Sequence, residues 1–279
     1  MSDLKVRKID FQFNQDIPFI TFPETPEWGN FVNVITLIAP AFERYFIKAF
    51  RTVIPKMTDL DLKADAEAFC AQEAQHSKHH MAHLRLLTHH YPGLAETDKK
   101  IRASYDALFK HESDAFHLGY AATVELTFGP IAKFVIENRH ILFKGSDERI
   151  ASFILWHLVE EFEHRNSAID VYKYSVGDYL YRMKIAPKVF KHIYDVYQIS
   201  LEGLKEHVYS DNLSGMALPH RAFDITPLPS RLNFFYHLCC TLLPYHNPDN
   251  LKQPDWVTKW FEDEAAGIDM RVYYPSVRP

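Results

Sequence analysis

Four long segments of this chain repeat apolar residues at steps of three and four positions, and a glutamate interrupts each apolar stripe near its middle. Steps of that size place side chains on one face of an α-helix. The four carboxylates therefore fall on helix faces that the apolar pattern assigns to a protein core. These glutamates are Glu43, Glu73, Glu125 and Glu161.

The periodicity continues through most of the chain and predicts an all-α fold. Only 9 glycines occur in 279 residues, and no run alternates cleanly enough to indicate a strand. We expect a bend in the third helical region near Gly119 or Gly129, and a cap on the fourth helix at Ser146. The predicted helices cover about 28–53, 58–90, 98–140, 146–176, 178–208, 231–243 and 254–265.

The positions of the prolines predict one helical domain over residues 1–279, which they divide into three parts. Residues 1–27 form an extended N-terminal arm, because three prolines interrupt them. Residues 28–208 form a helical bundle that contains the four stripe glutamates. Residues 209–279 form a Pro-rich connection and short covering helices.

Composition narrows the function classes. The formal net charge is −5 and there is no Lys/Arg-rich run, so the chain lacks the clustered cations that nucleic acid requires. The longest apolar stretch, FFYHLCCTLL at 234–243, is shorter than the roughly 20 residues that span a bilayer. The 3 cysteines have neither metal-knuckle nor disulfide-framework spacing. We therefore expect a cytoplasmic protein with no transmembrane segment and no nucleic-acid partner.

The four stripe glutamates point to metal binding. Burial of an unpaired carboxylate is costly, and the same stripes contain too few cations to neutralise four. Two of the glutamates begin Glu-x-x-His pairs, Glu73 with His76 and Glu161 with His164, and residues three apart share a helix face. Each pair can therefore direct an oxygen and a nitrogen inward.

Further histidines near these pairs have two interpretations each. His157 lies one helical turn before Glu161 and is either a third nitrogen ligand or a hydrogen-bond donor to a ligand carboxylate. His80 is either a core residue with a hydrogen bond or a ligand. A third pair, Glu137 with His140, has no partner glutamate one helix upstream and is not expected to bind metal. The predicted ligands are Glu43, Glu73, His76, Glu125, His157, Glu161 and His164.

The order of these residues, one Glu, then Glu-x-x-His, then one Glu, then Glu-x-x-His, resembles the ferritin-like di-iron and di-manganese carboxylate proteins. With His157 the set is similar to the seven ligands of the di-iron arylamine N-oxygenases, and that resemblance implies an iron-ligand role for His157. The chain also resembles a bacterial family labelled predicted metal-dependent hydrolases. Together these resemblances imply a four-helix bundle core with additional C-terminal helices.

Three functions are compatible with such a site. We first expect an enzyme with two metal ions, iron before manganese or a mixed Fe/Mn pair, that uses O₂ to oxidise a small organic substrate. The alternatives are a metal-dependent hydrolase with the same dinuclear site, and a non-enzymatic iron-binding protein. No dinucleotide fingerprint is present, so electrons would come from a donor protein or from the substrate. Catalytic residues beyond the metal centre, the substrate and the oligomeric state stay open.

Overall fold

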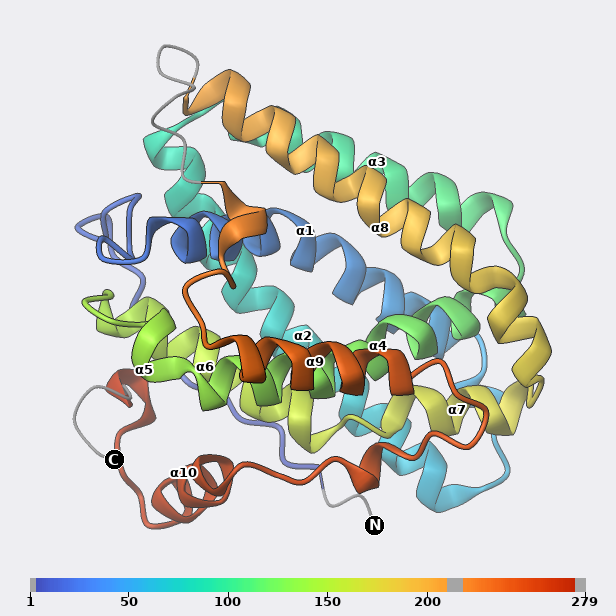
Figure 1. Ribbon diagram of the computed structural model, residues 1–279. Helices are drawn as coiled ribbons and strands as arrows, with labels where there is room; N and C mark the ends of the chain where they lie inside the picture. Colours follow the sequence, from blue (N-terminus) through green and yellow to red (C-terminus); the bar gives the residue numbers. More distant parts are fainter. Residues whose placement is uncertain (1–3, 210–217, 274–279) are drawn as a thin grey trace.

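The computed structural model describes residues 4–209 and 218–273, and every regular element within them is a helix (Figure 1). The prediction of an all-α fold is confirmed. The longer helices are α1 (Pro26–Arg51), α2 (Leu60–His90), α3 (Leu94–His111), α4 (Asp114–Glu137), α6 (Glu148–Glu163), α7 (Ser167–Ser175), α8 (Tyr179–His207), α9 (Leu228–Cys240) and α10 (Asp255–Ala265). The short ones are α5 (Arg139–Leu142), η1 (Ile54–Lys56), η3 (Pro219–Arg221), η4 (Pro248–Asn250) and η5 (Met270–Val272).

The core of the fold consists of α1, α2, α4 and the consecutive pair α6 and α7. Helix α1 packs along α2, helix α4 packs on α6 and α7, and α1–α4 and α2–α7 contacts join the two pairs. The helices of this core pack through apolar and aromatic side chains. Among those almost fully buried are Phe46, Phe69, Tyr120, Phe153 and Trp156. The four helices that carry the stripe glutamates are therefore neighbours.

Helices α3 and α8 lie side by side along one flank of the core (Figure 1). Their approach depends on Gly203, because a Cβ atom there would lie 2.1 Å from Thr97 Oγ1 on α3. Any larger residue would push the two helices apart. Helix α9 covers α4 on another side, and η5 contacts α6.

The third helical region differs from the prediction. It is divided into α3 and α4 at Glu112–Ser113, and α4 continues without interruption through Gly119 and Pro130. The reason is a cap: the Ser113 side chain accepts a hydrogen bond from the Phe116 amide and so satisfies one free donor at the start of α4. The capping serine has more influence here than the glycines.

The fourth helical region also differs in two places. Asp147, not Ser146, caps α6 by accepting a hydrogen bond from the Arg149 amide. The helix then ends at Glu163, and α7 begins only at Ser167. His164 is therefore the residue that closes α6 and not a residue within one long helix. The Arg165 guanidinium donates to the Phe162 carbonyl beside this turn, which satisfies an oxygen that the ended helix leaves free.

The other boundaries agree with the predictions to within a few residues, and the Asp59 side chain caps α2 by accepting from the Asp61 and Leu62 amides. The described residues before α1, 4–25, contain no helix and lie against the core. There Phe11 packs on Phe153 and Trp156 with ring centroids 5.8 and 5.5 Å apart. Across the described ranges, no helix is long and apolar enough to cross a membrane. The assignment of the chain to one domain stays a prediction.

Candidate metal centre

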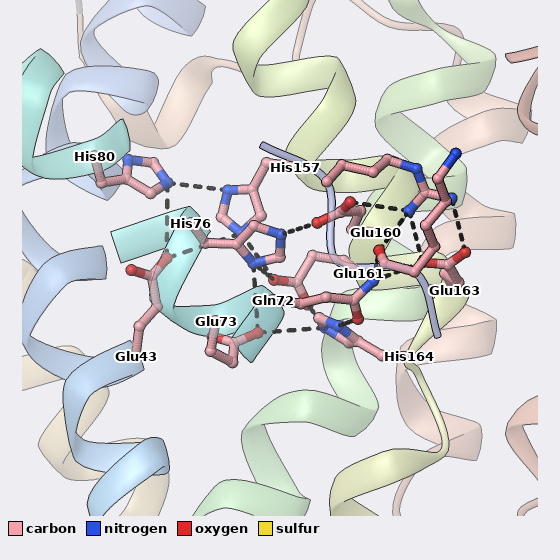
Figure 2. A network of polar contacts seen from close by, with 12 residues as sticks. Glu43, Gln72, Glu73, His76, His80, His157, Glu160, Glu161, Glu163 and His164 are labelled. Atoms are coloured by element: carbon pink, nitrogen blue, oxygen red, sulfur yellow. Dashed lines mark hydrogen bonds and ion pairs between the residues drawn. The ribbon is translucent and has the colours of Figure 1, made fainter. Parts of the chain in front are cut away.

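The four core helices bring the predicted ligand residues to one buried cluster, and Figure 2 labels all of them except Glu125. Helix α1 contributes one carboxylate, α2 a Glu-x-x-His pair, α4 one carboxylate, and α6 with its C-terminal cap the rest. His157 is the most exposed member, at only 7%. The cluster residues are Glu43, Glu73, His76, Glu125, His157, Glu161 and His164.

Glu161 is the member with the shortest contacts. Its Oε1 lies 2.8 Å from His157 Nε2, and its Oε2 lies 3.0 Å from His164 Nε2. The Nδ1 atom of His76 lies 3.6 Å from Glu161 Oε1 and 3.4 Å from Glu73 Oε1. One carboxylate thus faces three imidazoles from two helices and the turn after α6.

Donor atoms of these residues form overlapping groups, each small enough to surround one ion. Within the described ranges, four groups have ligand atoms within 4.8 Å of one another. Glu73 and Glu161 both belong to the group that contains His164, and each also belongs to a group that contains His76. Two carboxylates shared between neighbouring groups are what a dinuclear centre requires. The four groups are Glu73–Glu161–His164, His76–His157–Glu161, Glu43–Glu73–His76 and Glu43–His80–His157.

Glu125 belongs to none of these groups but lies beside them. Its Oε2 atom is 3.7 Å from His164 Nε2, and its side chain is 1% exposed. It is therefore close enough for its carboxylate to join the group around His164 after a small adjustment. Its role as a ligand stays a prediction, as do the roles of the other six.

The hydrogen bonding of the cluster fits metal ions. Both carboxylate oxygens of Glu43, Glu73 and Glu125, and Nδ1 of His76, are buried and make no hydrogen bond to the rest of the described chain. Buried polar atoms normally have partners, and a carboxylate without one is costly. Oxygen and imidazole donors of this kind suit Fe, Mn or Zn. The residues present therefore fit bound metal and are poorly explained without it.

The electrostatics of the cluster support the same view. Burial, reinforced by the charge of Glu73, raises the pKa of Glu43 well above its usual range. Burial, reinforced by Glu161 and Glu73, does the same to the pKa of Glu125. Burial also disfavours the charge on Glu161, yet the adjacent His164 and His157 outweigh it and lower the pKa of that carboxyl. Without cations, burial and like charge thus favour the neutral form of Glu43 and Glu125.

A second layer of side chains orients the histidines. His76 Nε2 lies 3.0 Å from Glu160 Oε2, and Arg7 Nη1 donates to Glu160 Oε1 at 2.9 Å. Burial disfavours the charge on His76, yet the carboxylates of Glu160 and Glu73 outweigh it and raise the pKa of His76 well above its usual range in the metal-free chain. With Glu160 beside Nε2, Nδ1 is the nitrogen that His76 would offer to a metal in the cluster. Arg7 also donates to both oxygens of Glu163, at 2.9 and 3.0 Å.

Gln72 fixes His164 in a similar way. Its Nε2 donates to Glu163 Oε2 at 2.6 Å, so its Oε1 is the acceptor that faces His164 Nδ1 at 3.1 Å. His164 Nδ1 therefore donates to Gln72, and Nε2, which faces Glu73 and Glu161, is the nitrogen that His164 would offer to a metal. The two Glu-x-x-His histidines thus present different nitrogens to the cluster.

His80 supports His157. Its Nε2 lies 3.0 Å from His157 Nδ1, while its Nδ1 lies 3.2 Å from Thr36 Oγ1. His80 Nε2 is also 3.9 Å from Glu43 Oε1, which places it in one of the four groups. Both interpretations of His80, hydrogen-bond partner and ligand, are thus compatible with its position.

Sequence reasoning missed part of this second layer. Glu160 is not among the predicted ligands, yet it is fully buried, and the arginine that pairs with it comes from the N-terminal arm. No local pattern relates Arg7 to α6, so only the tertiary structure could reveal the pair. Gln72 had a weak signal, since it is a polar residue beside Glu73 in a buried helix. Glu137 and His140 lie at the surface, and Glu137 pairs with Lys133.

The helices and the cluster together define an all-helical protein with a buried His/Glu metal-binding site. The model of one protein family, described as predicted metal-dependent hydrolase, matches residues 5–218. The chain belongs to this family. The matched range includes Arg7 of the arm and every member of the cluster. No curated protein and no solved structure matches the chain.

Proposed function

We propose that this protein is a metal-dependent hydrolase with a dinuclear centre held by the seven cluster residues. The observation that carries the proposal is the set of three buried carboxylates without hydrogen-bond partners, Glu43, Glu73 and Glu125, beside histidine nitrogens that face them. The description of the family supports hydrolysis over the O₂ chemistry that ligand order alone suggests.

The chain's own residues would hold the ions as two overlapping sets. Glu73 and Glu161 would be shared between the sets, because each of them lies in donor groups on both sides of the cluster. His164 would complete one set and His76 the other, with Glu125 and Glu43 at opposite ends. His157 would bind through Nε2, because its Nδ1 faces His80.

Metal ions in such a centre act as Lewis acids that polarise a carbonyl or phosphoryl oxygen and lower the pKa of water toward neutrality. The protein would contribute fixed ligand orientation, through Glu160 and Gln72, and a site with little access to bulk water. Glu43 and Glu125 would lose their protons on metal binding, since burial and neighbouring carboxylates raise their pKa values in the metal-free protein.

The test is metal content combined with hydrolysis. We expect about two equivalents of metal per chain by elemental analysis, and metal-dependent hydrolysis of esters or amides in the strict absence of O₂. The matched variants are Glu73→Gln, in the cluster, and Glu137→Gln, in the surface Glu-x-x-His pair. The proposal is supported if Glu73→Gln loses metal and activity while Glu137→Gln keeps both. Two bound metals with no hydrolysis of any substrate class would contradict it.

One observation favours a second candidate, O₂ activation. The order of carboxylates and Glu-x-x-His pairs over four neighbouring helices is that of ferritin-like di-iron proteins. Aromatic rings also enclose the cluster, with Trp156 5.0 Å from the His76 ring and Phe69 4.9 Å from the His164 ring. Anaerobically loaded ferrous protein separates the candidates: O₂ uptake in proportion to bound iron favours oxidation, and ester or amide hydrolysis without O₂ favours the hydrolase.

A further inference from the structure

A cavity of about 100 Å³ adjoins the cluster on the side of His157. It lies between α1, α4 and α6, and His80, His157 and Glu161 form its inner end. The rest of its wall is aliphatic and aromatic. The cavity therefore connects the donor atoms of the cluster with a purely apolar space.

The outer part of this cavity reaches the surface. Five of its lining side chains are half-buried, whereas its inner residues are almost completely covered. They come from all three helices, so the mouth is a gap between helix faces. The five are Phe31, Ile35, Phe128, Ile131 and Leu158.

The charge of the wall is as informative as its shape. Among the described residues that line the cavity there is no lysine or arginine, and the one carboxylate, Glu161, belongs to the cluster. A charged group placed in the apolar part of the cavity would lose its hydration without gaining a counter-ion from the wall. A neutral apolar group would lose only contact with water, which is favourable.

We propose that this cavity binds the apolar part of a neutral substrate and directs its reacting polar bond toward His157 and Glu161. This inference rests on the proposed function, which supplies the hydrolytic reaction. It adds the class of substrate, a neutral ester or amide with an apolar substituent. An apolar cavity of about 150 Å³ accommodates benzene. This smaller cavity of about 100 Å³ therefore fits a short aliphatic chain, or a single ring that extends into the half-buried mouth. Hydrolysis adds the elements of water across the C–O or C–N bond and releases an acid with an alcohol or amine.

The test uses the full-length protein as purified and two small probes followed by fluorine NMR. Fluorobenzene represents the neutral apolar group, and 4-fluorobenzoate represents the same ring with a charge. We expect saturable binding of fluorobenzene and at least about tenfold weaker binding of 4-fluorobenzoate. Equal affinity for both, or no saturable binding of fluorobenzene, would overturn the proposal.

Two substitutions in the wall locate the binding. Ile131→Trp fills the mouth and should weaken fluorobenzene binding by about tenfold or more. Phe128→Ala enlarges the cavity and should improve the saturable one-to-one binding of the larger probe 1-fluoronaphthalene. A cooperative unfolding transition in this variant distinguishes the gain from the non-specific binding of apolar probes by misfolded protein. If neither variant changes the affinity of its probe, the cavity is not the binding site.

The outcomes separate this inference from the proposed function. If each variant changes the binding of its probe as expected, but the protein hydrolyses no substrate, the cavity inference stands and the hydrolase proposal is wrong. Metal-dependent hydrolysis that is as fast for charged esters as for neutral apolar ones, and is unchanged in Ile131→Trp, removes the cavity inference and leaves the hydrolase.

Discussion

His76 Nε2 lies 3.0 Å from Glu160 Oε2, and the other nitrogen of the same ring consequently faces Glu73 and Glu161 (Figure 2). A hydrogen bond to one ring nitrogen determines which nitrogen keeps its lone pair. Glu160 thus orients the predicted ligand His76 without being a predicted ligand itself. Glu161, the next residue on α6, is itself a cluster member. Two adjacent carboxylates therefore have different roles, since Glu161 belongs to the cluster and Glu160 orients His76.

We predict that Glu160→Ala weakens metal binding by roughly 10- to 100-fold, because His76 loses the group that orients it. Chelator competition at fixed pH measures the change. The matched control is Glu137→Ala, which removes a glutamate from the surface Glu-x-x-His pair and should leave affinity unchanged. Equal metal affinities in the two variants would mean that Glu160 does not orient a ligand.

Arg7→Met should destabilise the protein strongly, because it leaves Glu160 buried without its cation. Removal of one partner from a buried ion pair costs about 3–5 kcal/mol. The control is Lys5→Met, whose ion pair with Glu264 is more than half exposed on the lysine side and contributes roughly 0–1 kcal/mol. Urea unfolding of both variants measures the difference. Adding Glu160→Gln to Arg7→Met should recover part of the lost stability, and a lack of recovery would show that Arg7 acts by packing alone.

Metal stoichiometry distinguishes the two roles of His80. If it supports His157 through the 3.0 Å contact, His80→Gln should retain about two metals per chain with weaker binding. His157→Gln, which removes the nitrogen 2.8 Å from Glu161, should lose one of them. Elemental analysis of both variants decides the matter. One metal in His80→Gln would make His80 a ligand.

The raised carboxyl pKa values predict an unusual pH dependence for the metal-free protein. A group whose folded pKa is raised contributes stability that is complete below its unfolded value and is lost as pH rises through the folded value. For Glu43 and Glu125 that loss begins above the ordinary value of 4.5. Metal-free protein should therefore melt at a lower temperature at pH 8 than at pH 5.5.

Glu125→Gln tests the origin of this dependence. The neutral amide should raise the melting temperature of the metal-free protein at pH 8 and flatten the pH profile, while it lowers metal content. The same substitution at exposed Glu137 should do neither. A wild-type profile in metal-free Glu125→Gln would show that the pH dependence between pH 5.5 and pH 8 does not come from this carboxyl.

The helical periodicity was sufficient to predict which residues meet at the cluster. Glu43, Glu73, Glu125 and Glu161 share inward faces because steps of three and four follow the turn of the helix, and long helices then stay in register with their neighbours. The divisions of the helices were harder to predict. The break between α6 and α7 lies in a turn that contacts a later segment, since Asn166 of this turn donates to Asp249 of η4.

The second layer could not be predicted, because it depends on segments that are remote in sequence. Arg7 precedes Glu160 by 153 residues, and no helical spacing relates the two. Gln72 lies on α2 but accepts from His164 at the end of α6. Periodicity places a residue on a face, whereas the partner of that residue follows only from how the helices assemble.

The arm that carries Arg7 is synthesised 153 residues before its partner Glu160 on α6. Closing such a long separation is slow compared with forming local helices. Helix α2 can therefore present Glu73 and His76 before Glu160 is in place to orient His76. On the proposed function, the metal site would be complete only in the finished fold, so metal loading would report on folding.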